Sequence, residues 1–184
     1  MSSTSPEETA PVPKSVRNYT LAMLVLIYAS SHVDRQIVSI LAESIKLELL
    51  LSDTQLGFLI GLSFALFYAT LGIPIAILAD RYSRRNIIAI SVIVWSAMTA
   101  FSGMAANYFQ LALARIGVGI GEAGSSPPSH SMISDLFPPE SRATAMGIYA
   151  TGINIGVLIG FLVGGVIDQL YGWRMAFFVV GIPG

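Results

Sequence analysis

Long apolar runs separated by short polar links make up most of the chain after residue 17. The runs at 55–78 and 86–106 carry no charged side chain, and each is close to the roughly 20 residues with which a helix crosses a bilayer. The link between them is short enough to require a tight hairpin. The pattern predicts an all-α membrane protein with helices at residues 18–45, 55–78, 86–106, 109–137 and 142–167 and an incomplete one at 175–184.

The two ends of the chain differ from the apolar runs between them. Residues 1–17 are rich in Ser, Thr, Pro and Glu and predict a disordered tail. A cleaved signal peptide is the alternative, but the acidic leader and the apolar residues that resume after Arg35 favour a retained helix. The last apolar stretch has only ten residues, so we expect the first part of a longer protein with a C-terminal half to follow.

Composition narrows the class of protein further. The chain is 54% hydrophobic and 11% charged, whereas soluble domains carry about 25% charged residues. A net charge of -1 argues against a nucleic-acid-binding protein. The absence of cysteine excludes disulfides, thiolate catalysis and cysteine metal sites. We expect no metal and no cofactor.

Lysine and arginine predict the orientation of the helices. Six of these residues fall on one side of the predicted spans, namely Lys14, Arg17, Arg81, Arg84, Arg85 and Arg142. Lys46 and Arg174 fall on the other side. Because cytoplasmic loops carry the excess of positive charge, the first side and the N-terminus are predicted to be cytoplasmic.

Four charged residues lie inside predicted spans: Asp34, Arg35, Arg115 and Glu122. A charge in the bilayer costs roughly 2.5 kcal/mol or more and is typically functional. At about 1.5 Å per residue, Asp34 and Arg115 reach similar depths, so either Arg115 or Arg35 could pair with Asp34. Glu122 follows Arg115 by two helical turns and shares its face.

This cluster predicts a proton-coupling device. A buried carboxylate holds or releases its proton according to whether a cation lies beside it. Asp34 and Glu122 are the expected protonation sites, and Arg115 and Arg35 the expected charge partners or headgroup ligands. A static salt-bridge network between two helices is the alternative, but four charges exceed what such a lock requires.

Small residues and prolines mark two further features. Gly152, Gly156, Gly160 and Gly164 recur every four residues, and such rows let helices approach closely in lipid. They predict either tight packing or a smooth surface on which a helix slides. The pair Pro127 and Pro128 predicts a break just past Glu122.

A second charged group is predicted at the cytoplasmic side. Its members are Asp80, Arg81, Arg84, Arg85, Asp135 and Arg142, from two hairpins at one membrane level. A simple topology signal would need arginine alone. The aspartates therefore favour a network that latches a cytoplasmic gate.

These residues resemble the major facilitator superfamily, and most of all its spinster-type transporters. The segment 78–85 (LADRYSRR) is similar to the superfamily's loop signature, although Ala76 and Ser83 stand where the family has glycine. The spinster resemblance rests on the segments 33–35 (VDR), 115–123 (RIGVGIGEA), 134–138 (SDLFP), 172–177 (GWRMAF) and 181–184 (GIPG).

The resemblance implies the N-terminal six-helix bundle of a twelve-helix secondary transporter, monomeric and in a bacterial inner membrane. It implies a proton-coupled carrier of a lysolipid or sphingolipid-like anion, and a small organic anion is the alternative substrate. An intramembrane enzyme is disfavoured because the chain has no H-E-x-x-H or G-x-S-x-G motif. A receptor or scaffold is disfavoured by the four buried charges.

Overall fold

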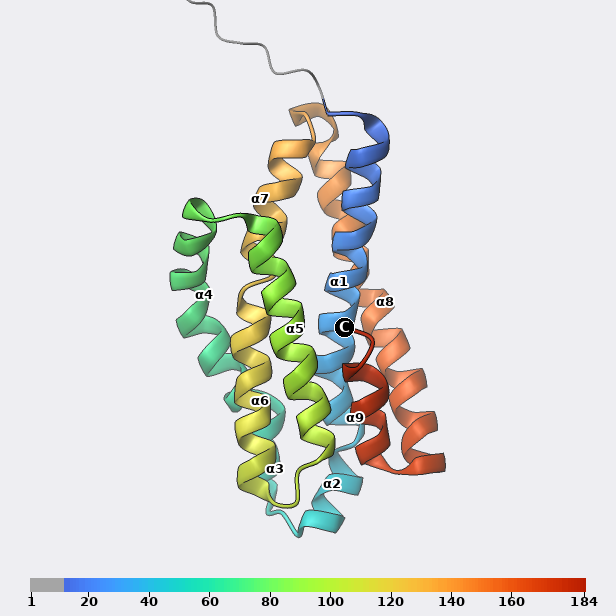
Figure 1. Cartoon of the computed structure of the whole chain (residues 1–184). Coiled ribbons are helices and arrows are strands. Elements are labelled where there is room, and N and C mark those ends of the chain that lie inside the picture. The colour runs from blue at the N-terminus through green and yellow to red at the C-terminus, as the bar shows by residue number, and fades with distance from the viewer. Residues whose placement is uncertain (1–11) are drawn as a thin grey trace, which may run out of the picture.

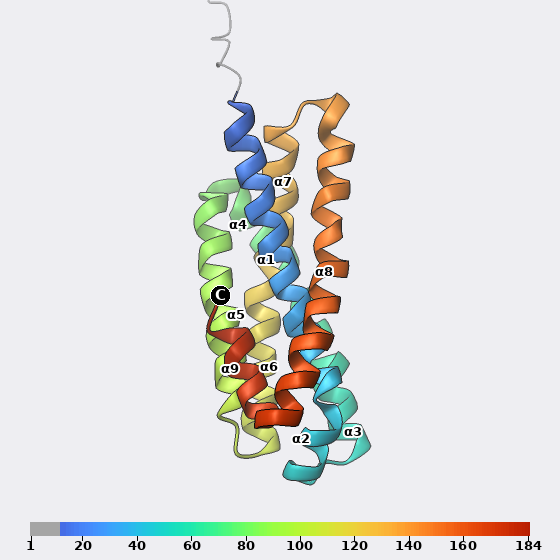
Figure 2. The same ribbon diagram turned by 90° about the vertical axis from the view of Figure 1, so that its right-hand side faces the viewer.

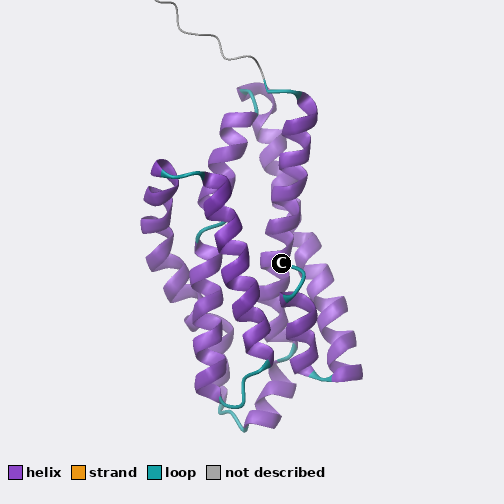
Figure 3. Ribbon diagram, viewed as in Figure 1, coloured by secondary structure: helices purple, strands orange, loops and turns teal. Residues whose placement is uncertain are grey.

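The computed structural model describes residues 12–184, apart from the side chains of Ser63, Phe64, Ala76, Ala79 and Asp80. This part of the chain is helical and contains no strand (Figure 3). Its elements are α1 (Lys14–Ile40), α2 (Ala42–Leu49), α3 (Asp53–Gly57), a π-helical turn (Phe58–Leu62), α4 (Ser63–Arg81), α5 (Arg84–Gly103), α6 (Tyr108–Ala123), α7 (Ser126–Leu136), α8 (Pro139–Tyr171) and α9 (Trp173–Gly181).

The long helices run side by side along one direction (Figure 1). The start of α1 and the turn between α7 and α8 lie at one end of the bundle, here called the Arg84 end. The short helices α2 and α3 lie at the opposite end, here called the Glu48 end. The predicted all-α fold is therefore confirmed.

Three helical segments in the described part of the chain are long and apolar enough to cross a membrane: Asp53–Ile75, Arg84–Gly103 and Pro139–Tyr171. The helix α1 is long, but in its second half all residues of the segment 30–36 except Val33 are polar or charged. The predicted helix 109–137 is divided into α6 and α7. The break lies two residues past Glu122, and Pro127 and Pro128 occupy the first turn of α7, where proline removes no helical hydrogen bond.

Several boundaries differ from the sequence prediction. The first helix begins at Lys14, so 14–17 are helical rather than part of a disordered tail, while residues 1–11 lie outside the described part. The predicted helix 18–45 is interrupted at Leu41, which ends α1 and precedes α2. Helix α8 begins at Pro139 instead of residue 142, because proline suits the first turn of a helix. It continues past residue 167 until Gly172, whose φ of 83° ends it.

A polar cap sets the start of the second predicted helix. The Ser52 hydroxyl accepts from the Gln55 backbone N–H at 3.2 Å, and the Gln55 side chain accepts from the Ser52 N–H at 2.9 Å. This reciprocal pair is a capping box, and it starts α3 at Asp53, two residues before the predicted boundary.

Glycines bring α8 into close contact with α1 from about residue 25 of α1 onward, where the two helices converge in Figure 2. Gly152, Gly156, Gly160 and Gly164 are all buried in this interface. A Cβ at Gly152 would lie 3.0 Å from the Val25 carbonyl oxygen, and one at Gly156 would lie 2.7 Å from the His32 Cβ. The row therefore serves close helix packing in the conformation seen here.

Two apolar clusters hold the bundle together at its two ends. The cluster at the Glu48 end joins α1, α6 and α9 through residues such as Ile37, Leu111 and Phe177. The cluster at the Arg84 end joins α1, α7 and α8 through residues such as Leu24, Ile133 and Tyr149. Between them lies a layer of buried polar and charged side chains from α1, α5 and α6.

Candidate functional site

The buried layer contains all four charged residues that the sequence places inside helices. Asp34, Arg115 and Glu122 are exposed by no more than 2%. The Arg35 side chain is exposed by 27%, so it alone of the four reaches a more open side of the bundle. A fifth side chain, Thr99 of α5, belongs to the layer and is fully buried.

Arg35 and Glu122 form the ion pair of this layer. Arg35 Nε lies 2.7 Å from Glu122 Oε2, which joins α1 to α6. The Arg35 guanidinium also lies over the Tyr68 ring of α4, 5.0 Å from its centroid. Glu122 Oε1 is buried and accepts no hydrogen bond from the described residues. One carboxylate oxygen is thus satisfied by a cation that is itself partly exposed.

Asp34 and Arg115 meet in a different way from the predicted pair. Arg115 Nη2 donates to the backbone carbonyl oxygen of Asp34 at 3.1 Å, not to its carboxylate. The Asp34 carboxylate accepts instead from the Thr99 hydroxyl, at 2.5 Å from Oγ1 to Oδ1. Equal depth allowed the predicted contact, but depth does not fix the direction of a side chain. Neighbouring residues on a helix point in different directions, so Arg35 turns to Glu122 and not to Asp34.

Thr99 is not among the residues predicted from the sequence, although the sequence contains a signal for it. Along the apolar helix α5 the small polar residues Ser91, Thr99 and Ser102 fall on one helical face, and all three are buried. A row of hydroxyls on the buried side of an apolar helix indicates a polar partner on a neighbouring helix. Asp34 is that partner for Thr99.

The charged group at the Arg84 end is only partly assembled. Arg84 and Asp135 form an ion pair between α5 and the end of α7. Arg142 donates from Nη2 to the Ser134 carbonyl oxygen at 2.8 Å, one residue from Asp135. Arg81 and Arg85 are exposed, and the Asp80 side chain lies outside the described residues. The contacts join α5, α7 and α8, and the share of Asp80 in a gate network stays a prediction.

The Glu48 end carries a second polar cluster. Glu48 Oε2 accepts from Trp173 Nε1 at 2.6 Å, and Glu48 Oε1 pairs with Arg174 Nη1. Arg174 Nη2 also donates to the Ala105 carbonyl oxygen at 3.0 Å. These contacts connect α2, α9 and the loop that follows α5. The hydrogen bond from Trp173, followed by the contact with Arg174, lowers the pKa of Glu48 from its ordinary value.

We expect the charge of Glu48 to add stability only above its unfolded pKa of about 4.5. The lowered pKa means that the folded state prefers ionised Glu48, so the contribution is present above that pH and fades as pH falls through the folded value. Glu48→Gln should lower the free energy of unfolding at pH 7 by less than about 1 kcal/mol, because the side chain is half exposed. The melting temperature should therefore fall only slightly. The difference in melting temperature from wild type should narrow in thermal scans as the pH falls below about 4.5. A pH-independent difference would contradict the assignment.

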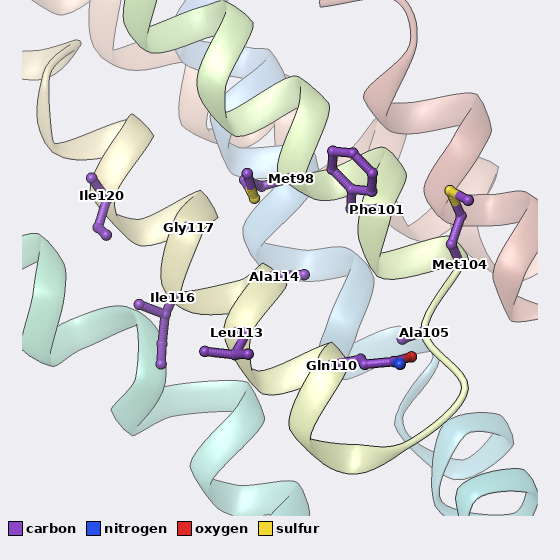
Figure 4. Close-up of a pocket in the computed structure, with 10 residues that line it drawn as sticks. All are labelled: Met98, Phe101, Met104, Ala105, Gln110, Leu113, Ala114, Ile116, Gly117 and Ile120. Carbon is purple, nitrogen blue, oxygen red and sulfur yellow. The ribbon is translucent and has the colours of Figure 1, made fainter.

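An apolar pocket of about 590 Å³ lies between α5 and α6, and Figure 4 shows the side chains that line it. Met98, Phe101 and Leu113 are among its lining side chains, and Gln110 is polar. None of the four charged residues of the layer lines it. The chemistry of the site is therefore separate from this pocket.

Comparison with known proteins places the chain in a family. The sequence profile of the Major Facilitator Superfamily matches residues 24–184. The chain belongs to this superfamily. Together with the long apolar helices, membership identifies a multi-pass integral membrane protein. Matching members of the superfamily are named as an efflux pump, a probable transporter and a homologue of a transporter.

Within the superfamily the chain is similar to bacterial members. It is 38% identical over 161 residues, 88% of this chain and 38% of the relative, to an "MFS-type efflux pump" of Mycolicibacterium smegmatis. It is 35% identical over 170 residues, 91% of this chain and 37% of the relative, to a "Probable L-galactonate transporter" of Escherichia coli.

A solved structure supports the predicted spinster resemblance. The fold matches a bacterial homologue of the human lysosomal transporter Spinster, in an inward-facing and unoccupied conformation, with a TM-score of 0.88 and 41% identity. The match covers 94% of this chain and 41% of that chain. The chain thus spans about two fifths of the length of the relatives it matches.

Proposed function

We propose that this chain is the N-terminal half of a secondary transporter that moves an anion across the bilayer by alternating access, driven by protons. The observation that carries the proposal is the buried layer in which Glu122 pairs with Arg35 while Asp34 is held by a neutral hydroxyl. Ionisable groups in a membrane span mark ion pathways and proton relays. A site at mid-depth between two rocking halves is typical of secondary transporters.

Arg35 and Glu122 provide the exchange that such a carrier needs. A proton on Glu122 removes the negative charge that pairs with Arg35, whose side chain is partly exposed. The released guanidinium then binds an anionic group, which it can do in bidentate fashion. Loss of the substrate and of the proton on the other side of the membrane restores the pair.

The substrate we propose is an amphipathic lysolipid or a sphingolipid-like anion. Its headgroup would lie near Arg35 and Arg115 and its chain along apolar helix faces. The similarity to the spinster homologue supports this class. A small organic anion is the second candidate, supported by relatives named for L-galactonate, hexuronate and sulfoacetate.

The orientation, the location and the partners belong to the same proposal. Positive charge gathers at the Arg84 end, so we place that end and the N-terminus in the cytoplasm. The relatives named above are bacterial, which supports the inner membrane. We expect a monomer, completed by a C-terminal six-helix half, with transport and no enzymatic turnover as its activity.

Uptake into proteoliposomes tests the substrate and the driving force together. With the full-length protein, we expect an inward proton gradient to accelerate uptake of a labelled lysophospholipid, and a protonophore to abolish the acceleration. Labelled L-galactonate, assayed in parallel, separates the two substrate classes. Uptake of either compound that ignores the proton gradient would refute proton coupling, and uptake of neither would refute both substrate classes.

A further inference from the structure

Asp34 accepts a hydrogen bond from the apolar part of α5, residues 86–103, in which the sequence predicts no functional residue. The Thr99 hydroxyl of α5 donates to Asp34 Oδ1 at 2.5 Å, and both residues are almost completely buried. Asp34 Oδ2 is buried as well and accepts no hydrogen bond from the described part of the chain. The two oxygens of one carboxylate therefore have different surroundings.

We propose that Thr99 is a positioning residue, which occupies Asp34 Oδ1 and so leaves Oδ2 as the oxygen of this carboxyl group that takes up and releases a proton during the transport cycle. This inference rests on the proposed function. A hydroxyl can donate only one hydrogen bond, and Thr99 donates its bond to Asp34 Oδ1. A proton that arrives on Oδ2 gives a neutral carboxyl group that still accepts from Thr99, and its departure restores the carboxylate. No other bond changes.

The other groups around Asp34 do not replace this contact. From α6, Arg115 donates to the Asp34 main chain, and Glu122 is engaged by Arg35. On α1 itself, His32 Nδ1 lies 2.9 Å from the Tyr28 carbonyl oxygen. In α8, the segment 143–167 contains no charged residue. The hydroxyl is thus the hydrogen-bond donor that the described residues offer to this carboxylate.

Thr99 differs in this respect from other hydroxyls in apolar helices. Ser102, one turn along α5 and also fully buried, donates to the Met98 carbonyl oxygen of its own helix at 3.0 Å. Thr70 of α4 likewise donates to the Leu66 carbonyl oxygen at 2.7 Å. Such bonds satisfy the hydroxyl within one helix. Thr99 instead connects two helices at the layer of buried charges.

The test removes the hydroxyl while keeping the shape of the side chain. In full-length Thr99→Val, the carboxylate loses a donor that favours its ionised form, so Asp34 should keep its proton to a higher pH. We expect the infrared band of the protonated Asp34 carboxyl, identified by its loss in Asp34→Asn, to titrate about 0.5 to 1 pH unit higher than in wild type. The pH profile of uptake should move in the same direction.

Matched variants separate positioning from packing. Thr99→Ser keeps the donor and should titrate as wild type, and Ser102→Ala removes a buried hydroxyl of the same helix without effect on the Asp34 band. If Thr99→Val folds poorly, Thr99→Ala removes the donor without added bulk and serves the same comparison. An unshifted band in both hydroxyl-free variants would overturn the role of Thr99. A shifted band in a protein whose uptake ignores pH would refute the proposed proton coupling and leave the role of Thr99 standing.

Discussion

Replacing Glu122 by Gln should abolish proton-driven uptake while leaving the full-length protein folded. Gln matches the size of Glu and can still accept a hydrogen bond from Arg35, whose nitrogen lies 2.7 Å from the carboxylate. It cannot carry a proton, so the step that releases Arg35 on protonation is lost. We expect uptake driven by a proton gradient to fall at least about tenfold, which corresponds to roughly 1.4 kcal/mol in the barrier.

Exchange of labelled for unlabelled substrate, without a proton gradient, distinguishes lost coupling from lost binding. Because exchange needs no net release of a proton, Glu122→Gln should retain much of it. Glu140→Gln, which neutralises an exposed carboxylate at the start of α8, is the matched control and should behave as wild type in both assays. Unchanged proton-driven uptake by Glu122→Gln would show that Glu122 does not carry the transported proton.

The fold could be predicted largely from the sequence because its signals are local. Each signal lies within one stretch of the chain. The signals are the uncharged runs about as long as a bilayer is thick, the Ser52 capping box and the proline pair after Glu122. Boundaries were less accurate where competing signals overlap. The interruption at Leu41 lies within an apolar run that contains no proline or glycine to mark it.

The members of the charged layer could also be predicted, but their contacts could not. A charged residue in an apolar helix is conspicuous, whereas its partner depends on how two helices cross and which way each side chain turns. Arg35 pairs with Glu122, and Arg115 binds the main chain of Asp34. Both contacts join residues that are far apart in the sequence, so no local pattern predicts them. Thr99 went unnoticed because a hydroxyl in an apolar helix commonly bonds its own backbone.

Gly156→Ala should strongly destabilise the contact between α1 and α8. The added Cβ would lie 2.7 Å from the His32 Cβ and still closer to the backbone oxygen of Ala29, and neither atom can swing aside as the end of a flexible side chain can. Overpacking of this kind costs about 1 to 3 kcal/mol. We expect a lower yield of folded full-length protein and a melting temperature several degrees lower in thermal scans.

A graded series within α8 shows whether close approach is the cause. Gly147→Ala and Gly165→Ala place a Cβ where no described atom lies within 4 Å, so they should be neutral or slightly stabilising. Gly164→Ala meets only side-chain carbons, of Ile37 and Ile40 with the nearest at 3.3 Å, and should have an intermediate effect. Equal losses at all positions would mean that helix backbone flexibility, not packing, matters. If Gly156→Ala kept its stability and lost transport alone, the glycine row would serve sliding of α1 past α8 during the transport cycle, which is the alternative that its spacing left open.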